Sequence, residues 1–189
     1  MRVFGIDPGS LRTGYGCIDS DGSCHRLVVC GAIATRGCET FADRLVAIHR
    51  ELVALIAVHA PAVVAVENLF HAANVRSALK LGHARGVALL AAAGQGVPIA
   101  EYTPAEIKRA VVGYGRAEKH QVQEMVRLLL GLPAVPEPND AADALAVAIC
   151  HVHMSVPAEV AAARAATAKG PASRALTSWR NYRPPGDPR

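Results

Sequence analysis

Four acidic residues stand out from the apolar sequence around them. Asp7 ends the apolar run over residues 2–6, and Glu67 ends a β-branched, uncharged run over residues 62–66. Asp140 and Asp143 are three residues apart in the first turn of a predicted helix, so they share one face of it. If the two runs are neighbouring strands and this helix packs across them, the four carboxylates meet in one cluster.

Four carboxylates that lie together repel one another, and their ionised forms are stable only with cations nearby. Oxygen ligands favour Mg²⁺, for which Mn²⁺ can substitute. Two such ions about 3.5–4 Å apart can activate a water and stabilise the leaving oxygen in phosphodiester hydrolysis.

Each acid also has a plainer interpretation. Asp140 and Asp143 would each favour a helix N-terminus by about 0.3–1 kcal/mol. Asp7 would be a turn residue, and Glu67 an ordinary acid at the end of a strand. Against this stands the cost of placing acids at the edge of a buried core without a purpose.

Composition and charge divide the chain into two parts. The 189 residues are 51% hydrophobic and 19% charged, which is typical of a folded domain rather than of a disordered chain. Residues 1–156 hold fourteen basic and fourteen acidic side chains, whereas residues 157–189 hold six basic and two acidic ones. We expect a folded domain over 1–156 and a flexible basic tail over 157–189 that makes auxiliary contacts with an anionic partner.

Several classes of protein are excluded by what the sequence lacks. No apolar run reaches the ~18–20 residues of a membrane-spanning helix, and the first residues do not form a signal peptide. The five cysteines are odd in number and form no C-x-x-C pair, which argues against a disulfide framework or a structural zinc site. These features predict a protein of the reducing cytoplasm with no membrane association.

The elements that must position the acids follow from periodicity and turn chemistry. Thr103, Pro104 and Glu106 form a predicted capping box with proline at the first helical position, Gly113–Gly115 end that helix, and Asn139 is expected to cap the last one. Strands are predicted over 2–6, 15–19, 27–35, 62–66 and 97–102, and helices over 40–58, 77–95, 104–112, 119–130 and 140–154.

The order of these elements indicates the fold class. Three successive strands predict an antiparallel meander, and the later alternation of helices and strands predicts parallel pairing. The expected architecture is α/β, a mixed five-stranded sheet with helices on both faces.

Short motifs follow one another without a gap over residues 1–155. They are Phe4–Ser10, Thr13–Gly16, Val66–Phe70, Ser77–Val87, Ile107–Lys108, Val111–Gly113, Ala117–Val122 and Asn139–Ala146. Each is weak alone, but the ordered set is specific, and it resembles the RuvC-type Holliday-junction resolvases. The resemblance implies an RNase H-like fold and a Mg²⁺-dependent endonuclease that nicks two opposed strands of a four-way DNA junction symmetrically, leaving 5′-phosphate ends.

The resemblance also assigns roles to the acids. The family's four catalytic, metal-binding acids fall on Asp7, Glu67, Asp140 and Asp143, and some members carry His at the third of these positions. It implies two metal ions per subunit during catalysis. It further implies a homodimer, a role in recombination and repair, and coupling to the branch-migration motor proteins RuvA and RuvB.

Two lysines and one phenylalanine are the next candidates. Lys108 and Lys119 match the family's active-site lysines and begin helices on either side of Gly113–Gly115, where each could hold a phosphate as a point charge. The alternative is a pair of solvated surface lysines. Phe70 lies in a loop-like stretch after Glu67, where an exposed aromatic could stack on bases for about 1–3 kcal/mol per base. The alternative is that it folds back into the core.

The helix predicted over 77–95 and the stretch before it supply further candidates. Asn74, Arg76 and Lys80 are expected to contact DNA, although the two basic side chains, like Arg85, could equally be solvated helix charges. Small residues four apart, Gly82 and Gly86, allow close backbone approach, which the resemblance assigns to the dimer interface. Separately, His151 and His153 are two residues apart on a predicted helix and point to different sides, which argues against a metal ion shared by that pair.

Two other classes of protein share some of these features. An actin- or Hsp70-like sugar kinase or ATPase also has Asp-x-Gly after its first strand, but it needs a second phosphate loop and a second lobe, for which 189 residues leave no room. A non-catalytic DNA-binding module that used the basic tail would give Asp7, Glu67 and Asp143 no role.

Overall fold

A mixed sheet forms the centre of the fold. The computed structural model describes residues 1–68 and 74–155. Strands β1, β2 and β3 pair antiparallel, whereas β4 is parallel to β1 and β5 is parallel to β4, in the order β3-β2-β1-β4-β5. The strand bounds are β1 Arg2–Asp7, β2 Arg12–Ser20, β3 His25–Ala34, β4 Val63–Glu67 and β5 Ile99–Tyr102.

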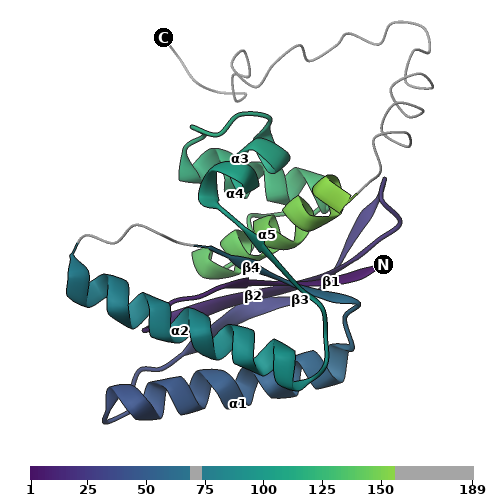
Figure 1. Cartoon of the computed structure of the whole chain (residues 1–189). Coiled ribbons are helices and arrows are strands. Elements are labelled where there is room, and N and C mark those ends of the chain that lie inside the picture. The colour runs from purple at the N-terminus through teal and green to yellow at the C-terminus, as the bar shows by residue number, and fades with distance from the viewer. Residues whose placement is uncertain (69–73, 156–189) are drawn as a thin grey trace, which may run out of the picture. The chain divides into compact units, whose positions relative to one another are not determined.

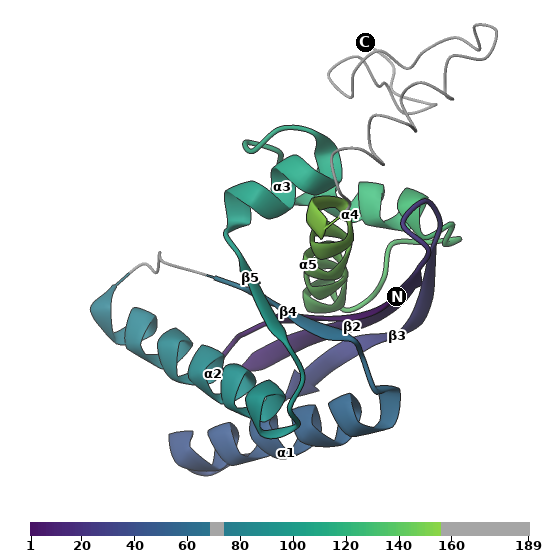
Figure 2. The same ribbon diagram turned by 45° about the vertical axis from the view of Figure 1, so that its right-hand side comes forward.

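Helices cover both faces of this sheet, as the sequence predicts. Figure 1 shows α1 and α2 on one side and α3, α4 and α5 on the other, and Figure 2 shows α5 lying across the strands. The helix bounds are α1 Phe41–His59, α2 Val75–Gly94, α3 Pro104–Val112, α4 Lys119–Leu129 and α5 Asn139–Ser155. Within the described residues, no helix has the length and apolarity needed to cross a membrane.

The face beneath α1 and α2 is packed by large apolar side chains. Phe4 and Ile6 of β1 are fully buried there in one cluster with Ile48 and Leu52 of α1. Burying each such side chain is worth about 1.5–3 kcal/mol. This face therefore supplies the main hydrophobic core and holds the central strands in place.

The opposite face is built differently, because the sheet has glycines where α5 crosses it. A Cβ on Gly5 would lie 2.0 Å from the Ala144 carbonyl oxygen, and one on Gly16 would lie 2.6 Å from the Leu145 side chain. These two glycines are paired across β1 and β2. The helix backbone can therefore rest directly on the strands.

The predicted elements are all present, with shifts at their ends. Strand β2 begins at Arg12 rather than at residue 15, because the Thr13–Gly14 stretch pairs with β3 and continues the strand. Asn139 is the first residue of α5 rather than its cap, and the Ala141 amide donates to the Pro138 carbonyl at 2.8 Å. The predicted capping box at Thr103 is confirmed. Phe70 and the tail over 157–189 lie outside the described residues.

Candidate active site

Two parallel strands carry the first pair of acids to one edge of the sheet. Ile6 of β1 is paired with Val66 of β4, so the next residues, Asp7 and Glu67, leave the sheet side by side. Their carboxyl groups lie close enough to interact directly. Two ionised carboxylates this close repel each other, which favours a proton on one of them in the absence of a cation.

The protonation of this pair follows from its surroundings. Burial raises the pKa of Glu67 from 4.5 to about 8, with help from the nearby charge of Asp7. Burial also raises the pKa of Asp7 from 3.8 to about 6, with further contributions from the charges of Asp143 and Asp140. Asp7, Glu67 and Asp143 are therefore close enough to act on one another, and the charge of Asp140 reaches Asp7 and Asp143.

Helix α5 brings Asp143 into the same cavity. Its Oδ2 lies 2.7 Å from Lys119 Nζ at the start of α4. Burial raises the pKa of Asp143 in spite of this ion pair. The cavity has a volume of about 320 Å³ and is lined by Asp7, Glu67, Pro104, Ile107, Lys108, Lys119, Val122, Asp143 and Ala146.

Asp140 occupies a different position from the other three acids. Its Oδ2 forms an ion pair with Arg12 Nε, at a distance of 3.0 Å, and Asp140 does not line the cavity. A Cβ on Gly14 would lie 2.0 Å from the Asp140 carbonyl oxygen, so this glycine allows the first turn of α5 to sit beside the end of β2. Arg12 is not among the predicted site residues, although a basic residue directly before the Thr13–Gly14 motif is visible in the sequence.

Local hydrogen bonds fix the segment that carries Lys119. The Tyr114 hydroxyl donates to Gln121 Oε1 at 2.7 Å, and the Glu118 amide donates to the same oxygen at 2.9 Å. The loop after α3 is thereby tied to the first turn of α4. Burial lowers the pKa of Lys119, but its hydrogen bond and ion pair with Asp143 outweigh burial and raise it overall.

The two predicted lysines line the same cavity as three of the predicted acids. Lys108 comes from α3 and Lys119 from α4, on either side of the loop that begins at Gly113. The Lys119 side chain is 60% exposed, so its ion pair with Asp143 contributes little to stability. Its ammonium group is accordingly accessible to an incoming anion.

The donor chemistry of the cluster fits a hard divalent ion, because every candidate ligand is a carboxylate oxygen. In residues 1–68 and 74–155, however, no three His, Cys, Asp or Glu side chains are arranged to hold an ion. Asp143 and Asp140 are instead paired with Lys119 and Arg12, cations that offset the same negative charge.

The remaining predicted DNA-contacting residues lie on α2 or at its start. The Asn74 side chain caps α2 by accepting from the Ser77 amide at 2.9 Å. Arg76 and Lys80 are exposed on the first turns of the helix. Arg85, by contrast, forms an ion pair with Glu101 of β5, so that residue joins a helix to the sheet.

Comparisons with known proteins agree with this geometry. The sequence model of the family described as crossover junction endodeoxyribonuclease RuvC matches residues 3–151. RuvC proteins of Koribacter versatilis and Syntrophotalea carbinolica are 54% and 58% identical over 156 and 153 residues, which cover 82% and 81% of this chain and 94% of each relative.

Solved structures give the same result. The structure of Thermus thermophilus RuvC in complex with a Holliday junction substrate has a TM-score of 0.78 at 37% identity, covering 82% of this chain and 94% of that one. A family match over most of the described residues and relatives above 50% identity exclude the kinase and the non-catalytic alternatives. The chain belongs to the RuvC family of crossover junction endodeoxyribonucleases.

Proposed function

We propose that this chain resolves Holliday junctions by divalent-metal-dependent phosphodiester hydrolysis, making paired symmetric nicks in two opposed strands. The observation that carries the proposal is the single cavity in which Asp7, Glu67 and Asp143 lie together with Lys108 and Lys119. Carboxylates can hold cations and lysines can hold a phosphate, and hydrolysis of a phosphodiester needs both.

The metal would be held by Asp7, Glu67 and Asp143, with Asp140 completing the set. Mg²⁺ is the ion we propose, with Mn²⁺ as a substitute and two ions per subunit during catalysis. Such ions, when bound, activate a water nucleophile and stabilise the leaving 3′ oxygen. The raised pKa values of Asp7 and Glu67 support this assignment, because nearby positive charge would favour the ionised form of both buried carboxylates.

The lysines would act on the substrate. Lys119 lies within 2.7 Å of Asp143 and is largely exposed, so it can hold the scissile phosphate beside the carboxylates. Lys108 lines the same cavity from α3 and can hold a neighbouring phosphate or the charge that develops in the transition state. We propose both as catalytic positions, with Phe70, Asn74, Arg76 and Lys80 as additional DNA contacts.

A groove on the other side of the fold supports a homodimer. It is lined by residues of α1 and α2, and it is mainly apolar although it lies open. The side chains of Leu79 and Leu90 are 59% and 61% exposed, and nothing lies within 4 Å of a Cβ built on Gly82 or Gly86. A second copy packed here would bury these leucines, and a twofold dimer suits two symmetric cuts.

The remaining assignments rest on family membership. We propose that the protein works with RuvA and RuvB, and that the basic residues of 157–189 add non-specific DNA contacts to a folded domain over 1–156. All five cysteines are free, which fits a reducing compartment, and we propose the cytoplasm.

The test is a comparison of two DNA substrates of the same sequence. A synthetic four-way junction and a linear duplex are incubated with the protein and Mg²⁺ or Mn²⁺. We expect paired symmetric nicks with 5′-phosphate ends in the junction and none in the duplex. Asp7→Asn should abolish cleavage while leaving junction binding intact.

Two outcomes would contradict the proposal. Cleavage of both substrates at equal rates would show that the protein does not select junctions by their structure. Undiminished cleavage by the Asp7→Asn variant in Mg²⁺ would show that the carboxylate cluster takes no part in the mechanism.

A further inference from the structure

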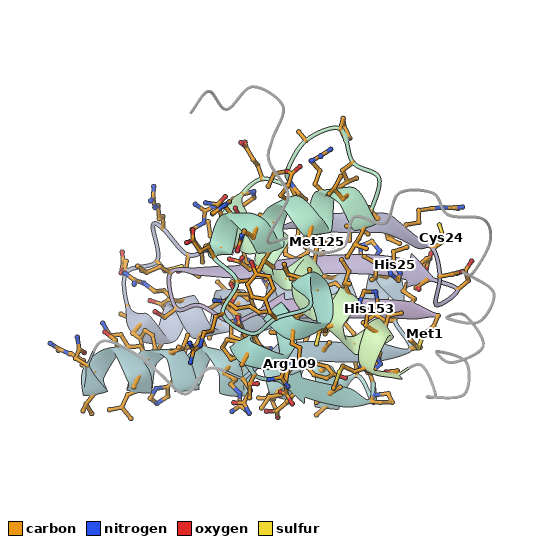
Figure 3. The ribbon with its side chains drawn as sticks, turned by 90° about the horizontal axis from the view of Figure 1, so that it is seen from above. Met1, Cys24, His25, Arg109, Met125 and His153 are labelled. Atoms are coloured by element: carbon orange, nitrogen blue, oxygen red, sulfur yellow. The ribbon has the colours of Figure 1, made fainter. Side chains whose placement is uncertain are left out.

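Two histidines far apart in the sequence face each other at the end of α5. His25 begins β3 and is only 7% exposed, and His153 lies in the last turn of α5. Their Nε2 atoms are 3.1 Å apart, and Figure 3 shows the two labelled side chains next to each other. The pair is about 15 Å along α5 from Asp143, at the helix rise of 1.5 Å per residue, so it is separate from the carboxylate cluster.

The other ring nitrogen of each histidine is held by its own partner. His153 Nδ1 lies 2.8 Å from the Ala110 carbonyl oxygen, and His25 Nδ1 lies 2.8 Å from Ser20 Oγ. A carbonyl oxygen only accepts hydrogen bonds, so His153 carries a hydrogen on Nδ1. In its neutral form, His153 therefore presents the lone pair of Nε2 to His25.

Ser20 leaves both neutral forms of His25 open. A hydroxyl group can donate to Nδ1 or accept from it. In the first case, His25 carries its hydrogen on Nε2 and donates it to His153. In the second case, two lone pairs face each other across 3.1 Å, and they repel unless a cation lies between them.

This arrangement has the features of a pair of metal-binding histidines. In such sites the metal binds one ring nitrogen, and a carbonyl or another polar group holds the N–H of the other, which fixes the ring and its tautomer. We propose that His25 and His153 form a binding site for a divalent transition-metal ion of the zinc class. Neutral imidazole nitrogens favour Zn²⁺, Ni²⁺ and Cu²⁺, whereas Mg²⁺ favours oxygen ligands, so the two sites select different ions.

The site has two protein ligands among the described residues. Across residues 1–68 and 74–155, no third His, Cys, Asp or Glu converges with the pair. Water fills the remaining coordination positions, and the affinity is lower than that of a four-ligand structural zinc site. The bound ion joins the start of β3 to the end of α5 and, through Ala110, to α3, and it stabilises the fold more as the free zinc concentration rises above the dissociation constant.

The test is calorimetric titration of ZnCl₂ into the full-length protein with excess Mg²⁺ present. We expect one zinc ion to bind per chain and to raise the unfolding midpoint. His25→Gln and His153→Gln should each weaken binding at least tenfold, about 1.4 kcal/mol. The matched control is His151→Gln, because His151 lies on the same turn of α5 but bonds to the Tyr102 hydroxyl at 2.8 Å. It should bind zinc as the unchanged protein does.

Three results would overturn the proposal. The first is that the protein binds no zinc in excess Mg²⁺. The second is that the unchanged protein and both histidine variants bind zinc equally. The third is that only Cys24→Ser loses binding, because that result would assign the ion to the exposed thiol. If a histidine variant does not fold, nitrogen NMR of the unchanged protein decides. Zinc must then shift the Nε2 resonances of both His25 and His153, and their failure to move contradicts the site.

Discussion

Glycines on the two sides of the sheet serve opposite purposes. On the α5 side, a Cβ at Gly5 or Gly14 would lie 2.0 Å from a backbone oxygen of the helix. On the outer side of α2, nothing lies within 4 Å of a Cβ at Gly82 or Gly86. The sequence alone does not distinguish the first pair, Gly5 and Gly14, from the second pair, Gly82 and Gly86. The first pair sets the distance between helix and sheet within the chain, and the second leaves the outer surface of α2 uncovered.

This difference bears on where the candidate site lies. Where α5 rests on the strands, its carboxylates come close to those at the strand ends, at a distance fixed by backbone contact. On the other side, large side chains of the strands and of α1 form the core, and the buried residues of α2 are alanines. A site that needs accurately placed carboxylates benefits from the first kind of packing, because backbone contact leaves little freedom to shift.

The largest effect is expected from filling the α5 contact. Gly5→Ala would place a methyl group against the Ala144 carbonyl and the Ala148 amide, both of which belong to the helix backbone and cannot move alone. We expect the free energy of unfolding to fall by about 3 kcal/mol or more. Urea denaturation measures it. Unchanged stability would show that α5 does not rest on β1 in this way.

The second effect concerns Lys119, one of the two lysines that line the cavity. Lys119→Ala should lower the single-turnover rate of junction cleavage by about 10²-fold with little change in junction binding, because it removes a charge beside the reacting phosphate. The control is Arg50→Ala on α1, whose side chain is 75% exposed and pairs only weakly with Glu51. Equal rates for the two variants would remove Lys119 from the mechanism.

A third effect is the pH dependence of stability without metal. Glu67 has a pKa of about 8 in the folded chain against an ordinary value of 4.5, and Asp7 has about 6 against 3.8. An acid whose pKa is raised by folding binds its proton more tightly when folded. The free energy of unfolding therefore falls as pH rises from about 4 to about 8 and levels off above that range.

The measurement is thermal unfolding in a chelator between pH 4.5 and 8.5, compared with Glu67→Gln. The variant lacks the Glu67 carboxyl group, so the difference between the two curves isolates the contribution of that group. Mg²⁺ should restore most of the lost stability at the high end. Parallel curves for the two proteins would contradict the assignment.

The smallest effect is expected on the open side. Gly86→Ala meets no neighbour and improves helix propensity, so the dilute chain should gain about 0.5–1 kcal/mol in unfolding free energy. The same methyl group should weaken self-association by holding a second helix away, as sedimentation velocity would show. If association were unchanged, the dimer would have to form on another surface.

Much of the fold could be predicted because the local signals are strong. Thr103 and Glu106 form the expected capping box, and Gly113, with φ of 93°, ends α3 where the sequence places a break. The predicted start of the second strand, at residue 15, was wrong. Thr13 and Gly14 are residue types common in turns, but here they are paired with β3 within the sheet. Pairing across strands overrides local preference there.

The candidate site, like the fold, could be predicted only in part from the sequence. The sequence by itself determined the candidate side chains of the site, because acids at the ends of apolar runs and lysines at helix starts are visible as types and spacings. Only the tertiary structure decided that Asp140 pairs with Arg12 and that Asp143 pairs with Lys119. The physical reason is that these ion pairs join elements distant along the chain. Their geometry depends on the position of α5, which lies close to the sheet because glycines there have no side chain.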